Sequence, residues 1–445
     1  MNKINIIIMG AAGRDFHNFN VVYRNNPLYN IVAFTATQIP NIDGRKYPSL
    51  LSGSNYPNGI PIYPESDLKS LIQKHNINQV VFSYSDVSFN YIMSKGAQIN
   101  ASGADFVTLG TNNTMLTPSK PVISVVASRT GAGKSQTSRK VVDILQKLGK
   151  ETVSVRHPMP YGDLVKQKVQ RFAKIEDLKK YDCTIEEMEE YEPHIARGNV
   201  IYAGVDYEAI LREAEKEAEI IIWDGGNNDL SFYKSDLTIT VVDPHRAGHE
   251  LNYYPGRTNV LLADVILINK IDSANLADIN AVRENVSKLN PQAAIIECAS
   301  PISLESAEKA KLIKGKRVLV VEDGPTLTHG EMKYGAGVIA AQKFGAKEII
   351  DPRSYAVKSI KETYDKYPGI GKLLPAMGYG DKQMKDLETT INKVPCDAVI
   401  IATPIDLRRI IKIKKPSVRI LYELQEIGKP DLTDILTEFV KRIKK

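Results

Sequence analysis

The sequence of 445 residues contains little cysteine and little histidine, and it has no long apolar run. Its three cysteines, Cys183, Cys298 and Cys396, lie far apart without a CxxC pair, which excludes a disulfide scaffold and predicts reduced thiols in a cytoplasmic protein. The apolar start at Ile4–Met9 is followed by Gly, Arg and Asp without a convincing cleavage region, so it predicts a buried strand rather than a signal peptide. Because no apolar run approaches the roughly 18 residues of a membrane span, we expect no membrane contact.

The net charge of the sequence is also small. There are 58 basic and 52 acidic residues, which gives a net charge of +6. Spread over this length, the excess is too mild to indicate a nucleic-acid partner, although it would suit a small polyanionic ligand held locally. The 43% of hydrophobic and 25% of charged residues are typical of an ordinary globular protein.

Apolar segments with β propensity alternate with helical segments along the whole chain, which predicts an α/β fold with mostly parallel sheets. The segment LTPSKP at 116–121 separates a first unit from an apolar strand that begins at Val122. We therefore expect one domain at residues 1–118 and a second at 119–445, in which the C-terminal strands complete a single sheet. A boundary in the Gly- and Pro-rich segment 364–380 is the alternative. The polar segment 40–64 is predicted to be a long loop, and loops of this length are often functional.

The strongest motif is SRTGAGKS at residues 128–135, between the expected strand at 122–126 and a helix expected at about 136–148. It matches a P-loop except that Ser128 replaces the first glycine, and it makes 119–445 a predicted P-loop NTPase domain. The glycines let backbone N–H groups face phosphate oxygens, while the lysine supplies a charge and the serine a hydroxyl for Mg²⁺. We expect ATP, or alternatively GTP, to bind at Arg129, Thr130, Gly131, Ala132, Gly133, Lys134, Ser135 and Gln136.

Two later motifs fit a bound nucleotide. The apolar strand at 220–223 ends in Asp224, which is followed by two glycines, and we expect Asp224 and Ser135 to hold Mg²⁺. The sequence NKID at 269–272 follows another apolar strand and has the form NKxD. In many GTP-hydrolysing P-loop proteins such a motif contacts the guanine base, which makes Asn269, Lys270 and Asp272 candidates. Asn and Asp are also favoured in ordinary turns, so the choice between ATP and GTP stays open.

Further polar side chains follow other expected strands. Parallel sheets bind ligands at the carboxyl ends of their strands, so these side chains are predicted to surround a second substrate beside the γ-phosphate. Arginines and histidines suit phosphate or carboxylate groups, which implies a small anionic, phosphorylated substrate. The candidate catalytic and substrate-binding residues are Lys134, Asp224, Arg156, His157, His245, Arg246, Glu322, Asp323 and His329.

The first unit carries MGAAGRD at residues 9–15 directly after its first strand. This GxxG pattern is reminiscent of a dinucleotide-binding fold. However, the second expected strand ends in FTATQ at 34–38, without the acidic residue that would bind a ribose. We therefore expect a Rossmann-like accessory domain that binds no nicotinamide nucleotide and instead grips another phosphate-bearing ligand or covers the main site.

Four blocks of sequence make the chain resemble an archaeal family of P-loop proteins. They are NIIIMGAAGRDFHNF at 5–19, residues 128–138, VEDGPTLTHGEMKYGAG at 321–337 and ATPIDLRR at 402–409. Members of this family are labelled predicted GTPases or cyclic 2,3-diphosphoglycerate synthetases. The resemblance implies a ligase that uses ATP and Mg²⁺ to close 2,3-diphosphoglycerate into an intramolecular phosphoanhydride, with release of ADP and phosphate. The alternatives are a small-molecule kinase and a GTP-hydrolysing switch that acts on a protein partner, and a homodimer is left open.

Overall fold

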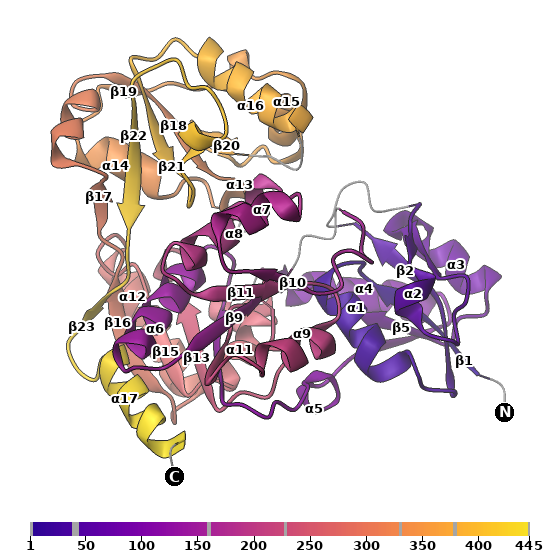
Figure 1. Cartoon of the computed structure of the whole chain (residues 1–445). Coiled ribbons are helices and arrows are strands. Elements are labelled where there is room, and N and C mark those ends of the chain that lie inside the picture. Colours follow the sequence, from indigo (N-terminus) through magenta and orange to yellow (C-terminus); the bar gives the residue numbers. More distant parts are fainter. Residues whose placement is uncertain are drawn as a thin grey trace.

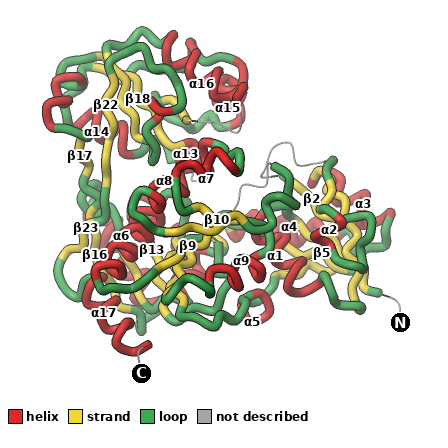
Figure 2. The backbone as a smooth tube through the Cα atoms, viewed as in Figure 1, coloured by secondary structure: helices red, strands yellow, loops and turns green. Residues whose placement is uncertain are grey.

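The computed structural model describes residues 3–37, 44–157, 162–226, 229–328, 332–376 and 381–443. In these residues the strands form three large sheets, which follow one another along the chain and are mostly parallel (Figure 1). Helices pack against the sheets, as the tube drawing in Figure 2 also shows. The chain is therefore a mixed α/β protein with mostly parallel sheets, as the sequence predicts. Among the described helices, none combines the length and the apolar character needed to cross a membrane.

The N-terminal sheet has six strands in the order β3-β4-β2-β1-β5-β7, and β3 is its antiparallel edge strand. Part of segment 44–64 forms β3, α2 and β4, so the expectation of one long loop at 40–64 is wrong for its described part. The strands are β1 (Ile4–Met9), β2 (Tyr29–Ala36), β3 (Lys46–Tyr47), β4 (Ile60–Pro64), β5 (Gln79–Phe82) and β7 (Asp105–Thr108). The helices are α1 (Gly13–Asn18), α2 (Ser49–Ser52), α3 (Leu68–Lys74), α4 (Phe89–Ala101) and α5 (Thr111–Thr114).

The central sheet has nine strands in the order β10-β11-β9-β12-β8-β13-β15-β16-β23, with antiparallel strands at both edges. Its strands are β8 (Val122–Ala127), β9 (Thr152–Arg156), β10 (Gln170–Phe172), β11 (Val200–Ala203), β12 (Ile220–Trp223), β13 (Leu237–Val242), β15 (Val265–Ile268), β16 (Ala294–Ala299) and β23 (Gln425–Ile427). Strand β8, with the sequence VISVVA, is buried throughout, as expected for a strand covered on both faces. It leads directly into the P-loop, so the motif lies in the middle of the sheet.

Helices cover both faces of the central sheet. Helix α6 begins at Lys134 and buries Val141, Val142 and Leu145 against the strands, and the chain turns at Gly149, whose φ of +72° suits glycine. Helix α12 starts after Asn275, whose side chain accepts a hydrogen bond from the N–H of Asp278. The helices are α6 (Lys134–Lys147), α7 (Ile175–Lys180), α8 (Ile185–Ile195), α9 (Tyr207–Ala214), α10 (His249–Asn252), α11 (Gly256–Leu261), α12 (Leu276–Leu289) and α17 (Leu432–Ile443).

The C-terminal strands form a sheet of their own. Its order is β17-β22-β21-β18-β19, and β20 also pairs with β18. The expectation that these strands complete the central sheet is wrong for all of them except β23, because β18 and β21 are buried in a separate hydrophobic core. The strands are β17 (Ile302–Leu304), β18 (Arg317–Asp323), β19 (Glu348–Ile349), β20 (Leu374–Ala376), β21 (Ala398–Ala402) and β22 (Ser417–Tyr422). The helices are α13 (Gly324–Thr328), α14 (Ala336–Lys343), α15 (Lys358–Lys366) and α16 (Asp381–Lys393).

A short antiparallel pair of strands joins the N-terminal part to the central part. Strand β6 (Val87–Ser88) follows the end of β5, and it pairs with β14 (Tyr253–Tyr254), which lies between α10 and α11. The pairing places the loop between β5 and β6, which contains Asp86, beside the P-loop. The N-terminal and C-terminal sheets lie on different sides of the central part (Figure 1).

Candidate nucleotide and substrate site

The P-loop has the backbone conformation that its glycines predict. It connects β8 to α6, and the φ angles of Gly131 and Gly133 are +81° and +116°, values that favour glycine. A Cβ atom on Gly133 would lie 2.1 Å from Nδ2 of Asn269, so this position also lacks the space for a side chain. The loop and the first turn of α6 therefore present backbone N–H groups in the way that phosphate-binding loops do.

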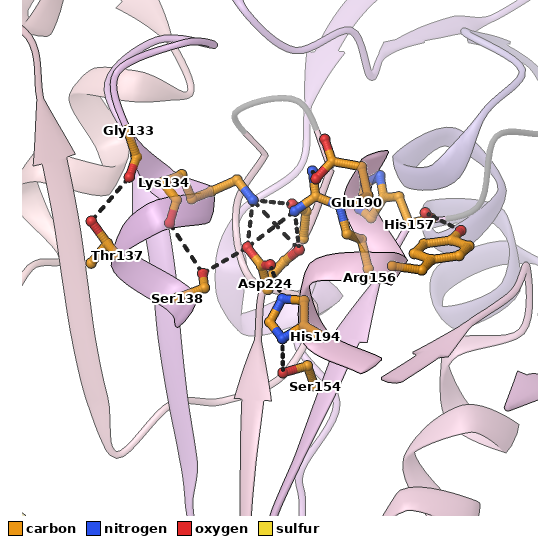
Figure 3. A network of polar contacts seen from close by, with 12 residues as sticks. Gly133, Lys134, Thr137, Ser138, Ser154, Arg156, His157, Glu190, His194 and Asp224 are labelled. Carbon is orange, nitrogen blue, oxygen red and sulfur yellow. Dashed lines mark hydrogen bonds and ion pairs between the residues drawn. The ribbon is translucent and has the colours of Figure 1, made fainter. Parts of the chain in front are cut away.

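The P-loop lysine contacts the end of β12. Nζ of Lys134 donates to Oδ1 of Asp224 at 2.7 Å and to the carbonyl oxygen of Gly225 at 2.6 Å (Figure 3). Burial lowers the pKa of Lys134, and the ion pair with Asp224 opposes that change. A phosphate that binds to Lys134 must therefore compete with Asp224 for the same ammonium group.

Asp224 is the centre of a buried polar network (Figure 3). Besides Lys134, its carboxylate accepts from Ser138 Oγ at 2.7 Å, pairs with Arg156 Nη1 at 3.1 Å and lies 3.0 Å from His194 Nε2. Burial alone would raise the pKa of Asp224, but Lys134 and Arg156 hold it well below its usual range. The group is therefore ionised at neutral pH.

The residues beside the P-loop are suited to bind Mg²⁺ together with the phosphates of a nucleotide. The described residues contain no cluster of three or more His, Cys, Asp or Glu side chains that could hold a metal ion. Mg²⁺ is commonly held by one or two protein oxygens together with phosphate oxygens, and the hydroxyl of Ser135 lines the site. Asp224 supplies a charged oxygen as well, but direct coordination by it requires Lys134 to move away.

The NKID residues lie against the P-loop. Nδ2 of Asn269 donates to the carbonyl oxygen of Ala132 at 2.9 Å, and Nζ of Lys270 donates to that of Gly131 at 2.7 Å. Asn269 is 0% exposed, whereas Asp272 is exposed and accepts a hydrogen bond from the N–H of Ser300. Asn269 and Lys270 therefore stabilise the loop, and a contact between Asp272 and a base stays a prediction.

A cavity of about 470 Å³ extends from the P-loop to the C-terminal sheet. It joins the carboxyl ends of β8 and β9 to the end of β18, so strand ends from two different sheets face one space. Of the residues that the sequence nominates, those that line it are Arg129, Thr130, Gly131, Gly133, Lys134, Ser135, Gln136, Arg156, His245, Arg246, Lys270, Glu322 and Asp323.

Comparison with known proteins decides the family. Residues 213–297 match the family described as CobW/HypB/UreG, nucleotide-binding domain, a range that contains Asp224 and the NKID segment. The chain is 63% identical over 443 residues to arginine synthetase ArcE of Thermococcus kodakarensis, and the alignment covers 100% of this chain and 98% of that protein. The chain belongs to the ArcE family. The P-loop nucleotide-binding domain is thus confirmed, while the relative is named for arginine rather than for cyclic 2,3-diphosphoglycerate.

A solved structure is also similar to this ArcE-family chain. It is the "apo" form of LpxK from Aquifex aeolicus in complex with ATP, with 12% sequence identity and a TM-score of 0.44. The match covers 84% of this chain and 99% of that one.

Several nominated residues of the ArcE-family chain lie elsewhere. Four of them do not line the cavity but contact the P-loop or residues that line it, as described above: Ala132, Asp224, Asn269 and Asp272. His329 lies outside the described residues.

The expectation that His157 holds the substrate is not supported, because this residue packs against the N-terminal part and is not among the residues that line the cavity. Its ring lies 4.9 Å from that of Phe232, and Nε2 is 3.8 Å from a carboxylate oxygen of Asp229. A Cβ on Gly13 of α1 would lie 2.6 Å from Nδ1 of His157, so the two parts are in close contact here. Burial lowers the pKa of His157 well below its usual value, with Arg14 adding to the effect, so the ring is neutral.

Sequence reasoning missed several residues of the ArcE-family site. Tertiary packing brings them to the site from helix α8, from the end of β22 and from positions in or beside the sequence blocks 128–138 and 321–337, where no P-loop rule assigns them a role. His194 of α8 holds Asp224, and Glu190 of the same helix pairs with Arg156 at 2.5 Å. The other cavity-lining residues of this kind include Arg139, Glu189, Lys333, Tyr334 and Tyr422.

Proposed function

We propose that this chain is an ATP- and Mg²⁺-dependent ligase whose product is arginine. The observation that carries the proposal is the 63% identity, over the full length, to a protein named arginine synthetase. The site supports it because one cavity contains a phosphate-binding loop at one end and unassigned polar groups of a second sheet at the other. Such an arrangement lets a nucleotide and a small molecule bind side by side.

In this proposal the chain acts by positioning and by neutralising charge. The P-loop N–H groups and Lys134 hold the β- and γ-phosphates, and Arg156 adds a second positive charge beside them. Mg²⁺, when bound with the nucleotide, neutralises further phosphate charge. Asp224 orients the ammonium group of Lys134 at the loop, and Arg156 and His194 hold Asp224 in place.

A phosphorylated anion such as 2,3-diphosphoglycerate is the second candidate substrate. The observation in its favour is the set of basic side chains in the cavity, which includes Arg139, Arg246 and Lys333. Carboxylates that line the same cavity oppose it, because they repel a highly charged anion. A GTP-hydrolysing switch differs from both candidates, since its turnover does not depend on a small molecule.

The test runs the reaction from its product side, so that the precursor of arginine need not be known. Purified protein is incubated with ADP, phosphate, Mg²⁺ and either arginine or no addition, and ATP is detected by luminescence. A parallel forward assay supplies ATP or GTP with 2,3-diphosphoglycerate and measures the release of phosphate. We expect ATP to form only with arginine, and Lys134→Ala to abolish its formation.

The matched control is Lys147→Ala, an exposed lysine in the last turn of the same helix, which is expected to retain full activity. If turnover requires 2,3-diphosphoglycerate and arginine has no effect, the second candidate replaces the first. If nucleotide is hydrolysed at the same rate with either compound or with none, the ligase proposal is wrong.

A further inference from the structure

The wall of the cavity that belongs to α8 and β18 is acidic. The carboxylates that line it are Glu189 and Glu190 of α8 and Glu322 and Asp323 at the end of β18. A nucleoside triphosphate brings several negative charges, so carboxylates in the same cavity would weaken its binding unless something positive lies between them. Arg156 is such a group near Glu190, with an ion pair of 2.5 Å. Glu322 has no comparable cation among the ion pairs of the described residues.

Only one of the two carboxylate oxygens of Glu322 accepts a hydrogen bond within the described part of the chain. Glu322 is 3% exposed, and its Oε1 accepts from the N–H of Val338, in the first turn of α14, at 2.9 Å. Oε2 is buried and has no hydrogen-bond partner within the described part of the chain. Leaving a buried carboxylate oxygen without a donor is unfavourable, so such an atom in a ligand cavity indicates a donor supplied by the ligand.

The backbone beside Glu322 keeps space for that ligand. Gly335 lines the cavity, and a Cβ atom there would lie 2.7 Å from Oε2 of Glu322. A side chain at position 335 would therefore cover the unpaired oxygen. Burial also raises the pKa of Glu322 to about 7, against the lowering effect of the nearby backbone N–H groups of Val338, Gly335 and Gly337, and neighbouring Asp323 adds to the rise.

We propose that Glu322 is a ligand-binding residue, whose Oε2 accepts a hydrogen bond from a positively charged nitrogen group of the amino acid that binds beside the nucleotide. That amino acid carries a guanidinium or ammonium group, as the proposed product arginine does, and Asp323 adds a second negative charge beside it. The C-terminal sheet thus binds the cation, and the P-loop binds the phosphates at the opposite end of the cavity. This inference rests on the proposed function and assigns the second ligand of the same site.

The experiment measures ligand binding to the full-length protein by isothermal titration calorimetry. Arginine, lysine and ornithine are titrated separately into protein saturated with ADP and Mg²⁺, and ADP is titrated into each variant. In Glu322→Gln, Oε1 is still able to accept from Val338, but the charge at Oε2 is gone. We expect the arginine Kd to rise at least tenfold, and the ADP Kd to stay within twofold of that of the wild type.

Two further variants separate the binding role from a folding defect. Gly335→Ala places a methyl group beside Oε2 and keeps the carboxylate, and we expect it to weaken arginine binding by a similar factor. Glu348→Gln removes an exposed carboxylate from β19 of the same sheet, and it should change neither Kd. Unchanged ADP binding shows that a variant is folded, and if Glu322→Gln fails to fold, Gly335→Ala carries the test.

The outcomes separate this inference from the proposed function. If arginine binds equally well to the wild type, Glu322→Gln and Gly335→Ala, the role of Glu322 is wrong, whereas arginine as the product stands. If arginine fails to bind but lysine or ornithine binds through Glu322, the proposed product is wrong and the cation site stands. If none of the three amino acids binds to the wild type, the cation site is overturned as well.

Discussion

Arg129 in the P-loop and Asp86 in the N-terminal part form a buried ion pair, in which Nε of the arginine lies 2.8 Å from Oδ1 of the aspartate. The other oxygen of Asp86 accepts a hydrogen bond from the P-loop N–H of Thr130 at 3.2 Å, and the guanidinium of Arg129 stacks 3.7 Å from the ring of Tyr253. The N-terminal part therefore fixes one side of the phosphate-binding loop. Gly13, in the GxxG segment that follows β1, lies at a second contact between the two parts, around His157.

We expect Asp86→Ala to destabilise the protein by roughly 3 kcal/mol, because truncating one partner of a buried ion pair leaves the other charge uncompensated. Arg129 is only 1% exposed, so water replaces little of the lost interaction. Thermal unfolding with and without ADP and Mg²⁺ measures the effect. The control is Asp105→Ala, an exposed aspartate at the start of β7, which should unfold as the wild type does. Equal midpoints for the two variants would contradict the structural role of Asp86.

The NKID segment gives two predictions that differ between its residues. Asn269→Ala removes the hydrogen bond to Ala132, so it should weaken the binding of ATP and of GTP by a similar factor of about 10. This factor corresponds to the loss of one hydrogen bond of about 1.4 kcal/mol. Asp272 is exposed, and if its carboxylate contacts the base, Asp272→Ala should change the ratio of the ATP and GTP affinities. Titrations with both nucleotides measure this. An unchanged ratio in Asp272→Ala would leave the aspartate with only its contact to Ser300.

The stability of the protein should depend on Glu322 between about pH 4.5 and pH 7. Burial raises the folded-state pKa of Glu322 from 4.5 to about 7, so the folded protein retains a proton that the unfolded chain releases. The stabilising contribution is complete below pH 4.5 and is lost as the pH rises through 7, which amounts to about 3 kcal/mol. Urea unfolding of the wild type and of Glu322→Gln at several pH values tests this. The difference in unfolding free energy between them should fall with rising pH, and two parallel profiles would contradict it.

Residue patterns predicted what depends on local sequence. The P-loop was predictable because two glycines at fixed positions and a strand-to-helix context determine its backbone. Its position beside the end of β12 followed from the rule that parallel strands present their carboxyl ends at one edge. The separate C-terminal sheet was not predictable in this way, because the apolar segments VLVV of β18 and AVIIA of β21 resemble those of the central strands. Nothing in such a strand indicates which neighbour it pairs with.

The misplacement of His157 has a simple geometric cause. Side chains at successive positions of an extended chain point in opposite directions. Arg156 points toward Asp224, so His157 at the next position points toward the N-terminal part (Figure 3). The residues His194, Glu190 and Asp86 were missed because their role depends on the packing of whole helices and loops, which a single sequence does not reveal.

The most direct test of the account follows phosphorus through the reaction. Phosphate labelled with oxygen-18 is incubated with the wild-type protein, ADP, Mg²⁺ and arginine, and phosphorus NMR resolves the isotope shift of each phosphate group. The account predicts that labelled oxygen appears in the γ-phosphate of ATP, that omission of arginine prevents this, and that Lys134→Ala shows no labelled ATP. If the label stays in free phosphate while ADP and arginine are both present and the protein is folded, the central claim is wrong.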